Sequence, residues 1–144
     1  MVNQPIELKD VTPAALKAAD IEVSEVVEGQ TLCNLITDPD RRDWGSVYNG
    51  ERGPHHNNTK MPLYLVGEEQ KYVWYPVTGD GLVVDLGADP YEEENLADDF
   101  EHTTDLQQWR GRLVERLTGR LEGFSIDGEI RTVTPESCYR RCYS

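Results

Sequence analysis

Apolar residues near the end of the chain recur at helical spacing. In TTDLQQWRGRLVERLTG, from Thr103 to Gly119, three leucines and a tryptophan recur every three or four residues, with arginines and glutamate between them. This spacing predicts an amphipathic helix from about Thr104 to Gly119, capped by Thr103 or Thr104. One side of the helix should be buried and the other exposed to water.

A second, shorter helix is predicted near the start of the chain. Asp10 or Thr12 can cap it, Pro13 suits its first position, and the alanines of PAALKAA favour helix. After Ile21 the segment VVEGQTLCNLITDPD indicates a connector that packs through a few leucines.

The middle of the chain changes to short runs of β-type residues bounded by Gly, Asp, Asn or Pro. In KYVWYPV, Tyr72, Trp74 and Pro76 should share one face of a strand, with Val73 and Tyr75 on the other. The polar turns VGEEQK and VTGDGL are typical of hairpins. We expect three or four antiparallel strands in the runs SVYNGE, MPLYLVGEE, KYVWYPV and GLVVDL. The final helix would cover one face of this sheet.

Composition narrows the possible partners. The 144 residues include 27 acidic and 14 basic side chains, giving a formal net charge of −13. This charge argues against nucleic acid and against an anionic membrane, because both are bound through clustered Lys and Arg. No stretch reaches the roughly 18 apolar residues of a membrane-spanning helix, and the first residues lack the pattern of a signal peptide.

The cysteines give no clear site. Cys33, Cys138 and Cys142 have neither zinc spacing nor the number needed for a disulfide framework. We interpret Cys33 as a small buried apolar residue, and Cys138 and Cys142 either form a disulfide or stay unpaired without a role. No serine or cysteine lies in a nucleophile elbow.

The loop ERGPHHNNTK is the best local candidate for a binding site. Its side chains Glu51, Arg52, His55 and His56 could meet an anionic or sugar-like ligand, although a solvated loop between strands explains them as well. The third histidine, His102, is expected to be exposed among acids. The acidic run DLGADPYEEENLADD does not have the spacing of a calcium loop, so we interpret it as a solvated approach to a helix.

The stretch KYVWYPVTGDGLVVDLGADPYEEENLADD, from Lys71 to Asp99, resembles the C-terminal signature of the sulfatase family. In that signature a K-Y-[IV]-W strand and a turn lead to a strand ending in D-L, then D-P, an acid and N-L-A. The matching residues are Lys71, Tyr72, Trp74, Gly79, Asp85, Leu86, Asp89, Pro90, Glu92 or Glu93, Asn95, Leu96 and Ala97.

Other segments resemble the family in the same order along the chain. QPIELKDVTPAALKAADI, EGQTLCNLI and SVYNGERG are similar to successive family segments, with Ala14, Asp20 and Thr31 as departures. LQQWRGRLVERLTGRLEGFSIDG, which includes Trp109 and Arg110, is similar to the closing helix and tail of arylsulfatase-like members. The resemblance therefore extends from Pro5 to about Gly128.

The resemblance implies a fold and an activity for the parent enzyme. Sulfatases are alkaline-phosphatase-like: a large α/β catalytic domain precedes a smaller antiparallel sheet packed on a helix. They hydrolyse sulfate esters of small molecules or carbohydrates with a formylglycine and a bound calcium ion. The formylglycine motif C/S-x-P/A-x-R is absent around Cys33 and Cys138, so no catalytic residue or metal ligand of the family is carried over to this chain.

We therefore expect an α+β chain with a four-stranded antiparallel sheet packed against the C-terminal helix. Residues 1–43 would be a helix and linker from the edge of the missing α/β catalytic domain, 44–124 the sheet and helix, and 125–144 a tail. The expected function is that of a sulfatase's C-terminal portion, inactive alone, whose loop residues Glu51, Arg52, His55 and His56 border the substrate cleft. The alternatives are a free-standing interaction module, or the same portion of a related phosphatase or phosphonate hydrolase. The compartment stays open.

Overall fold

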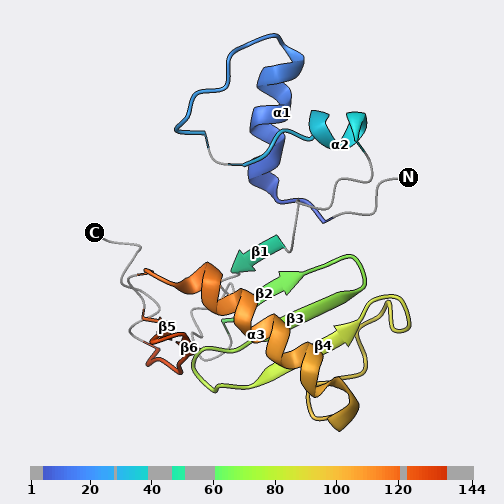
Figure 1. Ribbon diagram of the computed structural model, residues 1–144, viewed down its shortest axis with the longest axis vertical. Coiled ribbons are helices and arrows are strands. Elements are labelled where there is room, and N and C mark those ends of the chain that lie inside the picture. The colour runs from blue at the N-terminus through green and yellow to red at the C-terminus, as the bar shows by residue number, and fades with distance from the viewer. Residues whose placement is uncertain (1–4, 28, 39–46, 51–60, 121–122, 136–144) are drawn as a thin grey trace. The chain divides into compact units, whose positions relative to one another are not determined.

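The chain forms two units in the computed structural model (Figure 1). The structure describes residues 5–27, 29–38, 47–50, 61–120 and 123–135. One unit is Met1–Val47 and the other is Tyr48–Ser144.

The N-terminal unit is built around a buried aspartate. It contains the 3₁₀ helix η1 (Leu8–Asp10), α1 (Val11–Ala18) and α2 (Cys33–Thr37). The Asp10 carboxylate is 4% exposed and accepts the backbone N–H of Glu7 at 2.9 Å and of Gln30 at 2.8 Å. It therefore ties the loop before α2 to the start of α1. Of the two predicted caps, Asp10 is the residue that precedes α1, although its side chain makes no capping hydrogen bond, and Thr12 lies inside the helix.

Gly29 makes this tie possible. Its φ of +105° is a backbone conformation that side chains other than glycine's rarely allow, and an added Cβ would lie 2.5 Å from the carbonyl oxygen of Lys9. The loop and η1 therefore approach each other too closely for a side chain at position 29.

The second unit contains an antiparallel sheet. Its order is β1 (Val47–Gly50), β2 (Leu63–Val66), β3 (Gln70–Trp74) and β4 (Gly81–Asp85). β2 pairs antiparallel with β3, and β3 with β4, with Tyr72 opposite both Leu65 and Val83. The turn between β3 and β4 closes through Gly79, whose φ is +82° and whose N–H donates to the carbonyl of Tyr75 at 2.8 Å. The predicted hairpin at VTGDGL is confirmed.

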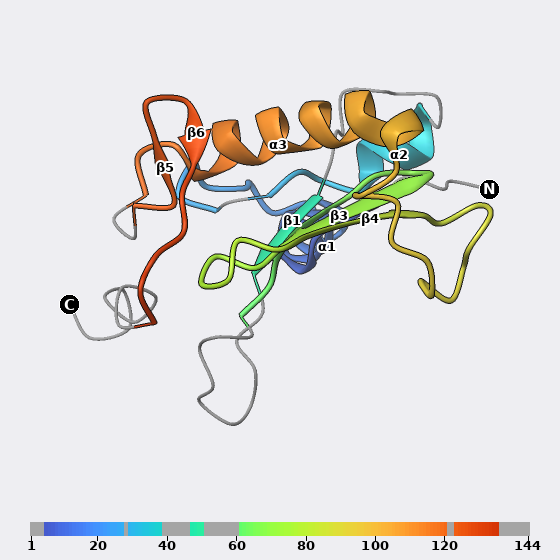
Figure 2. The ribbon, with the colours of Figure 1, turned by 90° about the horizontal axis from the view of Figure 1, so that it is seen from below.

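Helix α3 (Thr103–Leu117) lies along one face of the sheet (Figure 2). Its apolar stripe, in which residues recur every three or four positions, packs on alternate residues of the strands, because every second strand residue faces the helix. The core between them consists of Leu63, Leu65, Tyr72, Trp74, Val83, Trp109, Leu113, Leu117 and Phe124, all at most 4% exposed. The helix starts one residue earlier than expected and follows a 3₁₀ turn, η3 (Phe100–His102), so His102 and not a threonine precedes it.

The chain after α3 returns to the core. β5 (Ser125–Ile126) and β6 (Glu129–Ile130) form a two-stranded hairpin, although the pattern of residues predicted only a tail here. Phe124 is 1% exposed and meets Trp74 edge-to-face at 6.2 Å. The N–H of Val133 donates to the carbonyl of Pro76 at 2.9 Å. This segment therefore closes one end of the core.

The expected α+β class, with antiparallel strands covered by the last helix, is confirmed. The described pairings establish three antiparallel strands and the separate hairpin, and the antiparallel pairing of β1 as a fourth strand stays a prediction. Within the part of the chain that the structure describes, no helix is long and apolar enough to cross a membrane.

Candidate functional site

The four residues predicted to border a substrate cleft, Glu51, Arg52, His55 and His56, lie outside the described residues. The described residues that match the sulfatase signature lie on β3, β4 and the segment after β4, and those that match the family's closing helix lie on α3. Their contacts show what this signature does in the molecule.

Lys71, Tyr72 and Trp74 alternate across β3. Tyr72 and Trp74 point into the core beneath α3. Lys71 is on the other face, where its Nζ lies 2.6 Å from Glu92 Oε2 and 5.5 Å from the centre of the Tyr64 ring. The side chains of Lys71 and Glu92 are 22% and 36% exposed, so the ion pair is partly screened by water. It links β3 to the acidic segment after β4.

The Tyr72 hydroxyl is buried and has no hydrogen-bond partner among the described residues. Its ring fills the space above Gly81, where an added Cβ would lie 3.5 Å from the ring and 3.6 Å from the hydroxyl oxygen. Burial raises the pKa of the Tyr72 hydroxyl, and the nearby Arg110 side chain on α3 partly opposes this rise. The geometry between them is outside that of a hydrogen bond, so we assign the effect of Arg110 to its charge.

Asp85 and Asp89 fold the chain where β4 ends. Asp85 Oδ1 accepts the N–H groups of Gly87 at 2.8 Å and Ala88 at 2.9 Å, and Asp89 Oδ2 accepts that of Glu94 at 2.8 Å. These are turns in which a short carboxylate replaces a backbone acceptor. The Leu86 N–H donates to the backbone carbonyl of Glu69 at 2.7 Å, and Pro90 is exposed in the loop. The D-L and D-P parts of the signature therefore shape a turn.

Asn95 and Leu96 cover the outer edge of β4. Asn95 Oδ1 accepts the N–H of Val83 at 3.1 Å, and its Nδ2 donates to the carbonyl of Gly81 at 3.3 Å. The Leu96 N–H donates to the carbonyl of Val83 at 2.9 Å. One side chain and one backbone group thus replace the strand that β4 lacks on this side. We call residues 95–97 the edge segment; its Ala97 N–H donates to Asn95 Oδ1 at 3.0 Å. An unpaired edge invites another strand, and this one is blocked.

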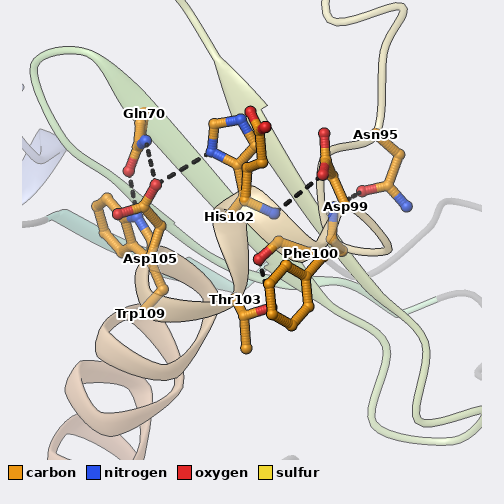
Figure 3. A network of polar contacts seen from close by, with 10 residues as sticks. Gln70, Asn95, Asp99, Phe100, His102, Thr103, Asp105 and Trp109 are labelled. Carbon is orange, nitrogen blue, oxygen red and sulfur yellow. Dashed lines mark hydrogen bonds and ion pairs between the residues drawn. The ribbon is translucent and has the colours of Figure 1, made fainter.

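Trp109 joins α3 to β3 through a polar chain (Figure 3). Its indole Nε1–H donates to Gln70 Oε1 at 2.9 Å, and Gln70 Nε2 lies 3.4 Å from Asp105 Oδ2. The same Asp105 oxygen lies 3.1 Å from His102 Nδ1. Expected to be exposed, His102 is in fact only 31% exposed at its side chain, and Gln70 was not singled out as a candidate. The partner of His102 is only three residues away, whereas Gln70 meets Asp105 and Trp109 at separations of 35 and 39 residues, which no local motif could reveal.

The described residues offer no metal centre: no three His, Cys, Asp or Glu side chains among them gather to hold an ion. The calcium ion of the family therefore has no fitting ligand set in the described part of this chain. The carboxylates of Asp85 and Asp89 accept backbone N–H groups, and that of Glu92 pairs with Lys71. The signature stabilises a fold, and nothing in its geometry indicates a nucleophile at work.

No protein-family model matches the chain. Over 135 residues, 94% of its length, the chain is 30% identical to an arylsulfatase of Clostridium perfringens (strain 13 / Type A). Over 117 residues, 81% of its length, it is 26% identical to an ulvan-active sulfatase of Formosa agariphila. The chain spans only 27% and 23% of these two relatives.

Solved structures show the same fold. A 2-O GAG sulfatase matches 76% of this chain with a TM-score of 0.65 at 22% identity, and the chain covers 24% of it. The phosphonate monoester hydrolase of Agrobacterium radiobacter matches 74% of this chain with a TM-score of 0.56 at 19% identity, and the chain covers 23% of it.

The sheet and the covering helix have the fold of the matching portions of these two hydrolases. Among such hydrolases the chain is related to the sulfatases and matches their C-terminal portion. The resemblance drawn from the sequence is confirmed.

Proposed function

We propose that this chain serves as the C-terminal portion of a sulfatase, supporting the catalytic domain and bordering the substrate cleft, and that it is inactive alone. One observation carries the proposal: 94% of the chain aligns with an arylsulfatase, yet it spans only 27% of that enzyme. The catalytic formylglycine and the calcium ligands would be supplied by the remaining part. The substrate would be a sulfated small molecule or carbohydrate.

The surface of the N-terminal unit supports this proposal. Leu8 is 88% exposed, Val26 86% and Ile36 77%, and Ile6, Val11 and Ile21 are each about half exposed. This number of exposed large apolar side chains on a small unit favours a covering partner. We assign that role to the catalytic domain, from whose edge residues 1–43 would come, while residues 44–124 would form the sheet and helix of the subdomain.

A direct assay tests inactivity. The isolated chain, supplied with calcium, should not hydrolyse p-nitrophenyl sulfate above the rate of buffer alone. Measurable turnover that persists through repeated purification would overturn the proposal.

A chimera tests the supporting role. The C. perfringens arylsulfatase without the quarter that this chain matches should regain p-nitrophenyl sulfate hydrolysis when this chain replaces the missing part. A matched chimera carrying Trp109→Ala should regain less, because Trp109 is 4% exposed in the core and its loss weakens the subdomain. Equal activity with and without this chain would contradict the supporting role.

The loop residues remain part of the proposal. Glu51, Arg52, His55 and His56 would contact the part of the substrate beyond the sulfate. In the active chimera, His55→Ala with His56→Ala should change the ratio of kcat/KM values between two sulfated substrates that differ only beyond the ester. An unchanged ratio would remove these histidines from the cleft.

A second candidate is the same portion of a phosphonate hydrolase, because a phosphonate monoester hydrolase has this fold. The sequence relatives favour sulfate esters. Comparing sulfate and phosphonate esters in an enzyme that contains this chain in its natural context separates the two: preference for the phosphonate ester would select the second candidate.

A further inference from the structure

The polar chain between α3 and β3 ends at an ionisable group that reaches the surface. It runs from the Trp109 indole through Gln70 and Asp105 to the His102 imidazole (Figure 3). We propose that His102 acts as a pH-responsive latch, which fixes Asp105 at the start of α3, and thereby sets the contact of Asp105 with Gln70 on β3, more firmly when the imidazole is charged. This goes beyond the proposed function, since it depends only on contacts within this chain.

The Trp109 indole determines which groups donate and which accept along this network of hydrogen bonds. The Nε1–H of Trp109 can only donate, so the atom of Gln70 that it meets at 2.9 Å must be the oxygen. The Gln70 amide nitrogen then faces Asp105 at 3.4 Å. Trp109 is 4% exposed, so its N–H has little access to water if Gln70 turns away.

His102 donates to Asp105 in both of its charge states. The ionised Asp105 carboxylate can only accept, so the Nδ1 that lies 3.1 Å from it must carry a proton even in the neutral ring. The second proton is therefore gained and lost at Nε2. Titration changes the strength of the contact, which is stronger with a charged donor, and does not break it. The contact therefore weakens gradually as the pH rises and the imidazole loses its charge.

The charges around the imidazole favour its cationic form. The hydrogen bond to Asp105 is the main cause that raises the pKa of His102, and the charges of Asp99 and Glu101 act in the same direction while desolvation opposes them. From β3 the side chain that joins the network is the uncharged Gln70. The N-terminus of α3 disfavours a cation, and the carboxylates outweigh it.

The sign of the pH dependence follows from this shift. A histidine whose pKa is higher in the folded than in the unfolded chain stabilises the fold fully below its unfolded value, near 6.5, and this stabilisation is lost as the pH rises through the folded pKa. The latch should therefore loosen in the range just above pH 6.5.

Nuclear magnetic resonance of the whole chain tests the proposal. The three tryptophans each give an indole N–H signal, and the signal missing in Trp109→Phe belongs to Trp109. Between about pH 5 and 8, where histidines change charge, this signal should follow a single titration whose midpoint equals that of the His102 ring and lies above 6.5.

Two variants decide whether the coupling uses the proposed path. His102→Gln should abolish the titration of the Trp109 signal, whereas the double variant His55→Gln with His56→Gln should leave it unchanged. Gln70→Met should leave His102 titrating and make the Trp109 signal independent of pH. The proposal is overturned if the Trp109 signal does not titrate in the unmodified chain, if it still titrates in His102→Gln, or if the His102 midpoint lies at or below 6.5.

Discussion

Replacing Asn95 by alanine should open the edge of β4. The Asn95 side chain accepts the N–H groups of Val83 and Ala97 and donates to the carbonyl of Gly81, at 3.1, 3.0 and 3.3 Å. Alanine removes all three hydrogen bonds and leaves the bond from the Leu96 N–H to the Val83 carbonyl, together with the packing of Leu96 and Ala97 on the core.

The expected loss is modest because the residue is exposed. Hydrogen bonds contribute a net ~0.5–1.5 kcal/mol each, and those within reach of water lie at the lower end of this range. Three such bonds give a decrease of about 1–2 kcal/mol in the free energy of unfolding. For a unit of this size that corresponds to a melting temperature lower by roughly 5–10 °C.

Urea unfolding followed by tryptophan fluorescence measures the change in free energy, and static light scattering measures association. Asn95→Asp should be intermediate, since a carboxylate still accepts from Val83 and Ala97 and no longer donates to Gly81. Glu93→Ala, an exposed change in the same acidic segment, serves as the control. If Asn95→Ala lies within ~0.5 kcal/mol of the unmodified chain, as an ordinary surface change does, and scatters no more light, the edge segment does not protect β4.

Three further changes test other contacts. Phe124→Ala should lower the free energy of unfolding by about 3–5 kcal/mol, because removing a ring that is 1% exposed and packed on Trp74 leaves a cavity. Urea unfolding measures this loss, and a loss below about 1 kcal/mol would show that this segment is not part of the core. Gly29→Ala should destabilise the N-terminal unit by about 1–3 kcal/mol, because position 29 has a left-handed φ and an added Cβ clashes with Lys9. Relative to the unmodified chain, amide hydrogen exchange should accelerate more in α1 than in β3; unchanged exchange in α1 would contradict this prediction. Removing the partly exposed ion pair of Lys71 by Glu92→Gln should cost at most about 1 kcal/mol, and less in high salt; a larger, salt-independent loss would show a role beyond the ion pair.

The periodic elements could be predicted from sequence because their signal is local. The spacing of Leu113 and Leu117 after Trp109 predicted α3, and the alternation of Tyr72 and Trp74 predicted which face of β3 is buried. Each pattern repeats within a few residues, so neighbouring positions are sufficient to identify it.

The hairpin after α3 was missed although a signal was present. Asp127 and Gly128 both have positive φ, +54° and +80°, which is the turn that an Asp-Gly pair favours between two short strands. The strands contain only two residues each, too few for an alternating pattern to appear.

The polar contacts of the signature could not be derived from spacing. Asn95 meets Val83 twelve residues away, and Trp109 meets Gln70 thirty-nine residues away. Such partners are set by how β4 and α3 lie in the fold. The sequence could therefore indicate the family of the signature, and only the structure shows that its polar atoms are used to hold strands, turns and helix together.

The return of the chain to the core after α3 determines where related enzymes could be recombined. Phe124 covers Trp74, and Val133 is tied to Pro76 on the turn after β3. A crossover placed just after the helix would join a sheet from one parent to a closing segment from another, and the two would meet at mismatched aromatic and backbone contacts. A crossover beyond Val133 transfers the sheet, the helix and their closing segment as a single inherited block.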